Sequence, residues 1–338
     1  MPYRPPSCLR VVVPAHQAAA DLGTCLAALA RAGFGPGAVV VVDDGSTDGT
    51  GRVARAAGAE VRRTARVGAA QARNVGARGF DGDLLIFVDS DVVVAPSART
   101  VIEAAFAADP DLTALFGSYD ARPAAPGRVS RFRNMLHRHV HQVSAGPVQS
   151  FWTGLGAVRR DAFVAVGGFD PSRRMMEDVD LGLRLAAAGG RIRLAPDLQG
   201  THLKAWTLGR MVRTDLLDRA IPWSRMILSR GGDLPRAFNV GWRGRVSVVA
   251  AAMVLAGLAL LPAMPLGGAA TAAAGVVCLG AANAPFLRRL RREGHGDLLA
   301  VAVPLLTVHY LCAGVGFAVA WASERVVGPV RRIIRRRD

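Results

Sequence analysis

Three short acidic clusters contain the residues whose types and spacing could carry out chemistry. The first covers residues 43–48, Asp-Asp-Gly-Ser-Thr-Asp, and directly follows an apolar run at 39–42. Its carboxylates could accept hydrogen bonds from ribose hydroxyls or from an N–H group of a base, and Gly45 allows the chain to turn sharply. The alternative is a polar turn in which one of these side chains caps the next helix.

The second cluster is Asp89-Ser90-Asp91, directly after the apolar run at 84–88. Residues two apart on an extended chain can project to the same side, where two carboxylates would repel each other unless a positive charge lay between them. A divalent cation with oxygen ligands, Mg²⁺ or Mn²⁺, would supply that charge and could bridge to substrate phosphates. The alternative is an acidic loop before a helix that begins near Pro96.

The third cluster, at 176–181, reads Met-Glu-Asp-Val-Asp-Leu and leads into a stretch of helical pattern. Acidic residues are common in a first helical turn, because the helix dipole favours negative charge there. The functional alternative is that Asp178 takes a proton from an acceptor hydroxyl as general base, while Glu177 orients the acceptor or supports the site.

The elements that would position these clusters follow a strand-helix alternation. Apolar, β-branched runs at 9–13, 39–42 and 84–88 indicate strands buried on both faces, and 21–32 and 68–79 have helical composition. This pattern predicts an α/β fold with a largely parallel sheet covered on both faces. Ligands of such sheets bind at the carboxyl ends of the strands, where the first two acidic clusters lie.

These clusters, in this order, resemble the family 2 glycosyltransferases of the GT-A fold, which is a Rossmann-like α/β fold. The resemblance covers residues 9–230, so residues 1–230 are predicted to form the catalytic domain. Segment 68–76 looks like the family's helix facing the nucleotide. Segment 152–160 is similar to the one lining the donor sugar and acceptor, and 167–170, Gly-Gly-Phe-Asp, follows as the family pattern has it.

The resemblance implies roles for particular residues and inversion at the anomeric carbon. Asp44 would face the nucleoside, Asp89 the ribose or metal, Asp91 would bind Mg²⁺ or Mn²⁺, and Asp178 would act as base with Glu177 beside it. His202 matches a position near the metal or diphosphate, although a lone histidine is more often structural. The full substrate-binding set is Pro14, Asp43, Asp44, Arg73, Asn74, Asp89, Trp152, Gly154 and Arg160.

The chain lacks the Gln-x-x-Arg-Trp motif of processive family members, which favours transfer of one sugar from a nucleotide-sugar. The acceptor could be a hydroxyl, a lipid-linked group or a polyprenyl phosphate, which needs no base. Nucleotidyl transfer is disfavoured, because 14–18, after the first strand, contains no glycine for a phosphate-binding loop. A non-catalytic membrane scaffold is disfavoured by the intact carboxylates at 44, 89, 91 and 178.

Charge and hydropathy indicate a membrane partner. Lys and Arg total 42 against 26 Asp and Glu, a net charge of +16, which attracts polyanions. Arginine clusters at 288–292 and 331–337 lie beside apolar segments, and this favours a membrane surface over nucleic acid. Since no zinc-type spacing or nucleic-acid module accompanies them, we expect no nucleic-acid partner.

Residues 231–338 are predicted to form a hydrophobic membrane anchor with two to four transmembrane or re-entrant segments. The candidates are 246–266, 269–287 and 298–322, with a break at Gly267-Gly268 between the first two. Three full crossings would put the arginine-rich tail outside, against the positive-inside tendency, so the number of crossings stays open.

Two further segments and the cysteines complete the prediction. Segment 128–143 is predicted to be an inserted amphipathic helix, whose three histidines would diverge around the axis instead of binding a metal. Segment 206–230 suits either an interfacial helix or a helix packed on the core. Four scattered cysteines and a Pro-rich start without a signal sequence lead us to expect a catalytic domain on the cytosolic side of the cell membrane.

Overall fold

The computed structural model describes residues 8–229 and 241–334, with side chains as far as residue 325. The described chain forms two compact units. The first, called the sheet unit below, contains the residues up to 125 together with 140–204. The second, the helical unit, contains 126–139 and the residues from 205 onward.

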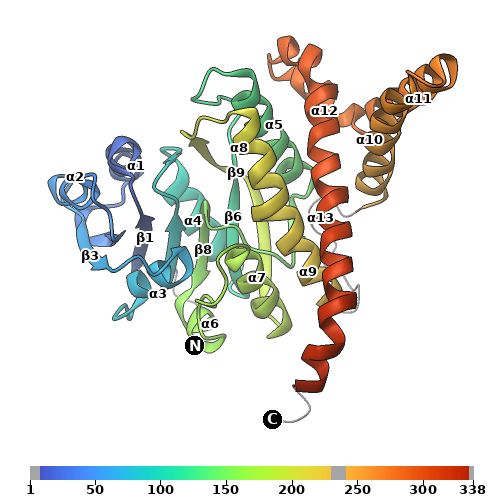
Figure 1. Ribbon diagram of the computed structural model, residues 1–338. Helices are drawn as coiled ribbons and strands as arrows, with labels where there is room; N and C mark the ends of the chain where they lie inside the picture. The colour runs from blue at the N-terminus through green and yellow to red at the C-terminus, as the bar shows by residue number, and fades with distance from the viewer. Residues whose placement is uncertain (1–7, 230–240, 335–338) are drawn as a thin grey trace. The chain divides into compact units, whose positions relative to one another are not determined.

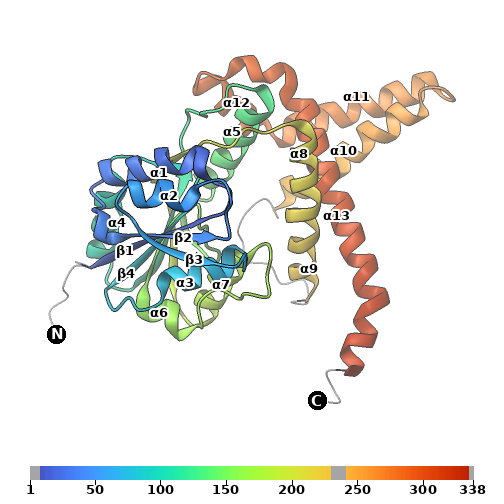
Figure 2. The same ribbon diagram turned by 60° about the vertical axis from the view of Figure 1, so that its left-hand side comes forward.

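Parallel pairing joins the first strands of the sheet unit, in the order β3-β2-β1-β4. Every residue of β2 and β4 is buried, which explains their continuous apolar sequences. Helices α1 and α2 cover one face of the sheet, and α3, α6 and α7 cover the other (Figures 1 and 2). The bounds are β1 Leu9–Ala15, α1 Ala19–Arg31, a 3-10 turn Pro36–Ala38, β2 Val39–Asp44, α2 Thr50–Ala56, β3 Glu60–Thr64, α3 Ala69–Ala77, β4 Leu84–Val88, α6 Arg160–Ala165 and α7 Glu177–Ala187.

The other half of the sheet is mixed, so the expectation of a largely parallel sheet holds only for β1 to β4. Strand β8 is antiparallel to β4 and β6, while β9 runs parallel to β6 and antiparallel to β5 and β7. Strands β5 and β7 have three residues each, and β9 mixes buried with partly exposed positions, so these three lack the long apolar runs that reveal β2 and β4. Their bounds are β5 Val92–Val94, α4 Ala98–Ala108, β6 Leu112–Tyr119, β7 Gly146–Val148, β8 Leu155–Arg159 and β9 Arg191–His202.

The helical unit has its own apolar core. Phe132, Met135 and Leu136 of α5 pack with Phe286, Leu290 and further apolar side chains of the later helices. Helix α5, Arg128–Val143, occupies the predicted segment 128–143 and ends in the sheet unit. The remaining elements are α8 Leu208–Arg213, a π-helix Thr214–Ala220, α9 Ile221–Ser229, α10 Trp242–Leu260, α11 Pro265–Ala282, α12 Ala284–Arg292, a 3-10 turn Gly296–Leu298 and α13 Leu299–Ile334.

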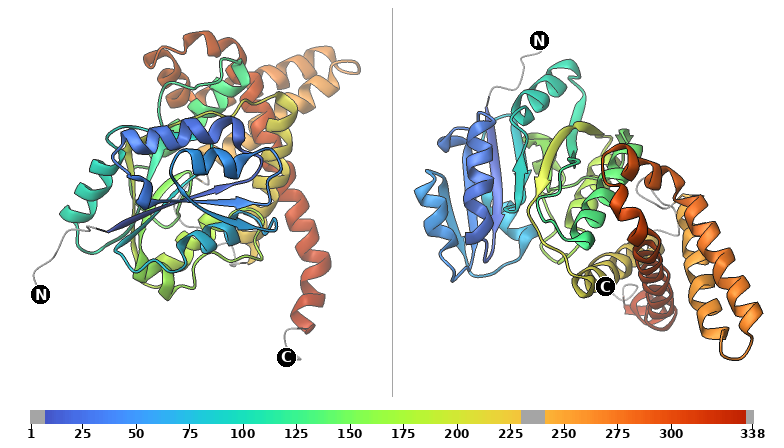
Figure 3. Two further views of the ribbon diagram at one scale, coloured as in Figure 1. Left: turned by 90° about the vertical axis from the view of Figure 1, so that its left-hand side faces the viewer. Right: turned by 90° about the horizontal axis from the view of Figure 1, so that it is seen from above.

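Three segments are long and apolar enough to cross a membrane: Trp242–Leu260, Pro265–Ala282 and Gly296–Arg325. The predicted break at Gly267-Gly268 is wrong, because α11 begins at Pro265 and both glycines lie within it. Gly268 serves close helix packing instead, since a Cβ there would lie 2.8 Å from the carbonyl oxygen of Gly257 in α10. Figure 3 shows α10 and α11 side by side as the two orange helices.

Segment 206–229 packs within the helical unit. Helix α9 and the π-helix contact α13, and Met211 and Met226 are buried. Leu208 and Leu217 are exposed on the same segment. The packed alternative therefore describes its buried side, and Leu208 and Leu217 remain as single exposed apolar side chains.

Candidate active site

An open cavity of about 230 Å³ lies in the sheet unit at the carboxyl ends of β1, β2 and β4. Strand-end cavities of this kind are the usual ligand sites of open α/β sheets. The predicted site residues that line it are Pro14, Asp44, Arg73, Asp89 and Asp91.

Asp91 and His202 form a pair beside this cavity. Strand β5 begins just after Asp91 and is antiparallel to β9, so that Val92 lies opposite His202 and Asp91 Oδ2 comes within 3.3 Å of His202 Nε2. The ring of His202 stacks on that of Tyr119, with centroids 4.7 Å apart, which fixes its orientation. Burial raises the pKa of Asp91, but the His202 contact and the charge of Lys204 outweigh it and hold the pKa below its usual value.

This pair fits a divalent cation that is shared with a substrate. In the part of the chain that the structure describes, no group of three or more acidic, histidine or cysteine side chains could hold a metal by itself. Mg²⁺ is commonly bound by one or two protein carboxylates together with water and substrate phosphates, and imidazole also suits transition metals. A carboxylate and an imidazole 3.3 Å apart could therefore provide the protein's part of such a site.

Arg73 joins two of the acidic clusters. Its guanidinium donates to Asp89 Oδ1 at 2.8 Å and to Glu177 Oε1 at 2.6 Å, and the residue is only 4% exposed. Burial lowers the pKa of Arg73, but the charges of Asp89 and Glu177 outweigh it and raise the pKa. Burial raises the pKa of Asp89 despite the opposing charge of Arg73. Asp89 is thus an ion-pair partner of Arg73 and is less available to a metal than Asp91.

Asn74, the next residue of α3, is engaged with the backbone. Its side-chain amide donates to the carbonyl of Phe169 at 2.8 Å and accepts from the N–H of Phe169 at 2.9 Å. The Phe169 ring in turn lies 5.6 Å from the Arg73 guanidinium carbon. Asn74 therefore ties the Gly-Gly-Phe-Asp segment to α3 and does not line the cavity.

Asp178 stands at the start of α7, where its pKa is strongly shifted. Burial, then the adjacent charge of Glu177, raises the pKa of Asp178 to about 7. One of its oxygens accepts from the N–H of Val179 at 2.8 Å. A carboxyl whose pKa lies near neutral pH is suited to general base catalysis. Asp180, two residues later, instead pairs with Arg173 and Arg184.

The carboxylates at the end of β2 are used by the local backbone. Asp44 accepts from the Thr64 hydroxyl and the Val67 N–H through Oδ1, and from the Gly68 N–H through Oδ2. Burial raises the pKa of Asp44, but these three donors outweigh it and lower the pKa. Asp43 is buried and accepts from the N–H of Ser46 across the turn at Gly45.

Strained backbone gathers in loops of this region. Among the described residues, the non-glycine residues with positive φ are Gln17, Arg66 and Met176. Gln17 follows β1, Arg66 lies in the loop held by Asp44, and Met176 precedes Glu177. Such conformations cost free energy and concentrate at functional sites.

Several residues of the site carry no motif in the sequence. The ring of His16 makes a 2.8 Å hydrogen bond with the carbonyl of Asp44, and the Gln17 side chain accepts from the N–H of Thr47 at 2.9 Å. Tyr119, which supports His202, lies at the end of β6. For His16 and Gln17, the feature of the sequence that could have indicated a place in the site is their position directly after a buried strand.

Trp152 and Gly154 belong to the segment next to Tyr119. The Trp152 ring packs edge-on against Tyr119, with centroids 5.0 Å apart, and a Cβ on Gly154 would lie 2.1 Å from Trp152. Arg160 does not join the site, because Arg159 pairs with Leu84 at the start of β4 and Arg160 donates to the carbonyl of Phe80. The cavity lies at the opposite end of that strand.

The histidines of α5 diverge. His141 makes a 2.9 Å hydrogen bond with the carbonyl of Gly117, whereas His139 lies 3.2 Å from Arg289 Nε. Burial, then the charge of Arg289, lowers the pKa of His139 to about 4.

Residues 10–167 match a known family model, described as glycosyl transferase family 2. Residues 10–167 belong to glycosyltransferase family 2. A segment of 193 residues is also 25% identical to a protein of Haemophilus influenzae described as an uncharacterized glycosyltransferase. That match covers 52% of this chain and 61% of the relative's length.

The chain also has a solved structural neighbour. The mannosyltransferase PcManGT from Pyrobaculum calidifontis, in complex with GDP-Man and Mn²⁺, superposes with a TM-score of 0.55 at 20% identity. The match covers 94% of this chain and 88% of the archaeal chain. The family and the GT-A fold predicted from the sequence are thereby confirmed, together with apolar helices after the domain.

Proposed function

We propose that this protein is an inverting glycosyltransferase that moves one sugar from a nucleotide-diphospho-sugar to a hydroxyl or lipid-linked acceptor at the cytosolic face of the cell membrane. The observation that carries the proposal is the Asp91–His202 pair beside the strand-end cavity, in a domain of glycosyltransferase family 2. The proposed site takes a nucleotide-sugar donor in the cavity and an acceptor near Asp178.

The donor side relies on Asp91 and His202. A Mg²⁺ or Mn²⁺ ion bound there would supply neutralisation of the charge that develops on the leaving diphosphate. The archaeal mannosyltransferase was solved with GDP-Man and Mn²⁺, which supports this assignment. His202 is held by the Tyr119 ring, so its Nε2 points to Asp91 before any ligand arrives.

The acceptor side relies on Asp178 and Glu177. Asp178, with a pKa of about 7, would take the proton from an acceptor hydroxyl as that oxygen attacks the anomeric carbon, and the attack opposite the diphosphate inverts the configuration. Glu177 is held by Arg73 and fixes the first turn of α7. The alternative is a polyprenyl-phosphate acceptor, which is already anionic, and Asp178 would then serve to position it.

The membrane part of the proposal rests on the three apolar segments. Only 22–33% of each most apolar window is buried inside the protein, so most of its surface is available to lipid. Such a surface requires an apolar environment. A membrane-held enzyme would be well placed to meet a lipid acceptor, which supports a lipid or lipid-linked substrate.

Asp91→Ala tests the assignment. We expect turnover of the preferred donor, chosen from UDP-, GDP- and dTDP-sugars, to fall on the order of 10³-fold, because several kcal/mol of charge stabilisation are lost. Calorimetry should show weaker Mn²⁺-dependent binding of the nucleoside diphosphate. The control is Asp81→Ala, which removes an exposed carboxylate that forms no hydrogen bond or ion pair within the described chain. Undiminished, metal-dependent turnover by the Asp91 variant would refute the metal role.

A further inference from the structure

Helix α12 presents three arginines on one face. Arg288, Arg291 and Arg292 are exposed and form no ion pair with any residue that the structure describes. At about 100° per residue their side chains fall within an arc of about 100° around the helix axis. The positive charge of this arginine face is therefore concentrated and unneutralised.

The opposite face of α12 is anchored in the helical unit. Phe286 and Leu290 are buried in the core of that unit, and the Phe286 ring lies 5.7 Å from that of Phe132. These two residues are four apart and thus share one side of the helix. The rotation of α12 is consequently fixed, and the arginine face cannot turn inward.

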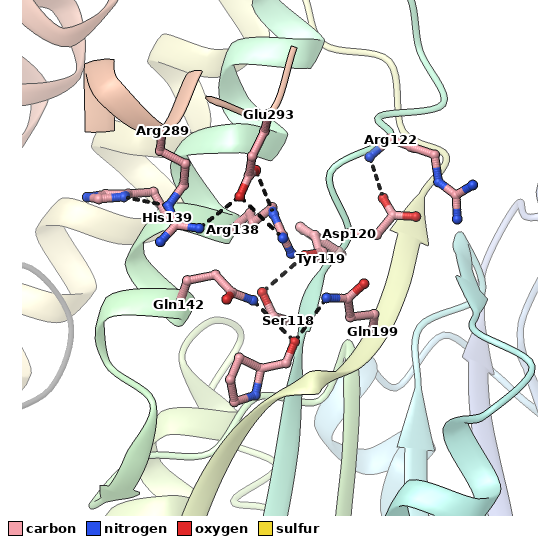
Figure 4. A network of polar contacts seen from close by, with 11 residues as sticks. Ser118, Tyr119, Asp120, Arg122, Arg138, His139, Gln142, Gln199, Arg289 and Glu293 are labelled. Atoms are coloured by element: carbon pink, nitrogen blue, oxygen red, sulfur yellow. Dashed lines mark hydrogen bonds and ion pairs between the residues drawn. The ribbon is translucent and has the colours of Figure 1, made fainter. Parts of the chain in front are cut away.

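The remaining arginine of α12 has a different role. Arg289 donates to Glu293 at 2.8 Å, and Glu293 also accepts from Arg138 at 2.9 Å (Figure 4). Arg289 and Arg138 thus share one glutamate on the inner side of the helix. Glu293 is occupied by two inner arginines, so it does not neutralise the arginine face.

The position of α12 in the chain places it at a membrane surface. The candidate span Pro265–Ala282 ends two residues before α12, and the next candidate span begins at Gly296, four residues after it. Residues 283–295 include a helix and are too short to cross a hydrocarbon core of about 30 Å and return. Both spans therefore meet α12 at the same bilayer surface.

We propose that Arg288, Arg291 and Arg292 bind the phosphate groups of anionic phospholipids in that surface. The inference rests on the proposed membrane attachment and adds the lipid class that the protein selects. Arginine matches phosphate by charge and by its forked N–H donors. Continuity with two apolar spans favours lipid head groups as the occupant, because a phosphate-bearing lipid has its tails beside those spans.

The test compares the full-length protein with a triple variant, Arg288→Gln with Arg291→Gln and Arg292→Gln, in nanodiscs of equal phosphatidylglycerol and phosphatidylcholine. Native mass spectrometry of the released protein gives the ratio of the two lipids that remain bound. We expect the parent to retain phosphatidylglycerol preferentially, and the triple variant to lose this preference by about tenfold or more. Glutamine keeps a helix propensity close to that of arginine.

A matched control removes the same charge elsewhere. Arg31, Arg52 and Arg55 are exposed on α1 and α2 of the sheet unit, so their triple change to Gln should leave the lipid ratio at the parent value. This inference alone would be overturned if the parent protein entered nanodiscs but retained no excess of phosphatidylglycerol. It would also be overturned if the two triple variants gave the same ratio of bound lipids. Failure of the folded parent to enter nanodiscs would overturn the membrane attachment as well.

Discussion

The carboxyl ends of β2 and β4 look alike in sequence and are used differently. Both strands are buried along their whole length, and acidic residues stand at or just after the carboxyl end of each strand. At the end of β2, Asp44 accepts three hydrogen bonds from the loop at 64–68. After β4, the side chain of Asp91 pairs with the ring of His202, its one ion-pair partner among the residues that the structure describes, and Asp91 lines the cavity. The carboxylate at the first end holds the loop beside the cavity, and the one at the second end could bind a metal.

The difference shows what decides the use of a carboxylate. Backbone N–H groups that converge on an oxygen satisfy it locally and lower its pKa, as they do for Asp44. Where such donors are few and burial dominates, the pKa rises, as it does for Asp178. We expect Asp44, whose oxygens are satisfied locally, to matter for stability, and Asp91 and Asp178 to matter for turnover. The following variants test this comparison.

The largest effect is expected for Asp178→Asn. With a hydroxyl acceptor, turnover should fall by about 10²–10⁴-fold, the usual contribution of a general base. In the parent, kcat/KM should rise with pH through about 7, because only the deprotonated carboxylate takes a proton. Asp180→Asn is the control, since that residue pairs with Arg173 and Arg184 and should affect stability more than turnover.

The outcome of that experiment also separates two acceptor classes. Unchanged turnover with a hydroxyl acceptor would exclude Asp178 as the base. Unchanged turnover with a polyprenyl phosphate, but not with a hydroxyl, would favour the phosphate acceptor, because that nucleophile is already deprotonated.

A smaller effect is expected when Arg73 is changed. Arg73→Lys keeps the charge but cannot reach Asp89 and Glu177 with two fixed donors, so kcat should fall on the order of 10–100-fold. Arg73→Gln also removes a charge that lowers the pKa of Asp178, so the rise of kcat/KM should move to higher pH. Kinetics across pH 5–9 would measure both effects.

Arg184→Lys provides the comparison for Arg73. Arg184 pairs with Asp180 on the same helix but does not bridge two acidic clusters. We expect it to leave the pH midpoint unchanged. Equal midpoints for the parent and Arg73→Gln would show that Arg73 supports folding only and does not tune Asp178.

Strands β1, β2 and β4 could be predicted from sequence because they have no exposed side to interrupt the apolar run. Strand β9 could not, since its twelve residues mix buried with partly or fully exposed positions and include Pro196. The same holds for β3, whose five residues are all partly or fully exposed. The helix break at Gly267-Gly268 was misplaced because glycine has two uses. It ends helices by its backbone freedom, and within helices its small size permits the contact seen at Gly268.

For the site, the sequence identified which residue types gather at the strand ends but not which way they face. Asp91, His202 and Arg73 come together from three distant segments, a result of strand register and helix packing. Asn74 was expected to contact substrate, yet its amide fits the Phe169 backbone. Hydrogen-bond geometry of this kind depends on contacts about 95 residues apart in the chain, which a motif does not encode.

The smallest effect on turnover, and the clearest on stability, is expected for Asp44→Asn. An amide cannot accept from donors at both positions, so the free energy of unfolding of the variant should fall by about 1–3 kcal/mol. Each kcal/mol should lower the Tm by about 2–4 °C. The pKa of Asp44 is lowered by folding, so its stabilising effect is present above the unfolded pKa near 3.8 and is lost as pH falls through the folded value.

The pKa of Asp178 is raised by folding, so Asp178→Asn should instead become more stable than the parent as pH rises to about 7. Thermal unfolding of both variants from pH 4 to pH 8 should therefore give Tm differences of opposite sign at neutral pH. An unchanged Tm for Asp44→Asn, together with a raised KM for the donor, would contradict the comparison and return Asp44 to the nucleoside.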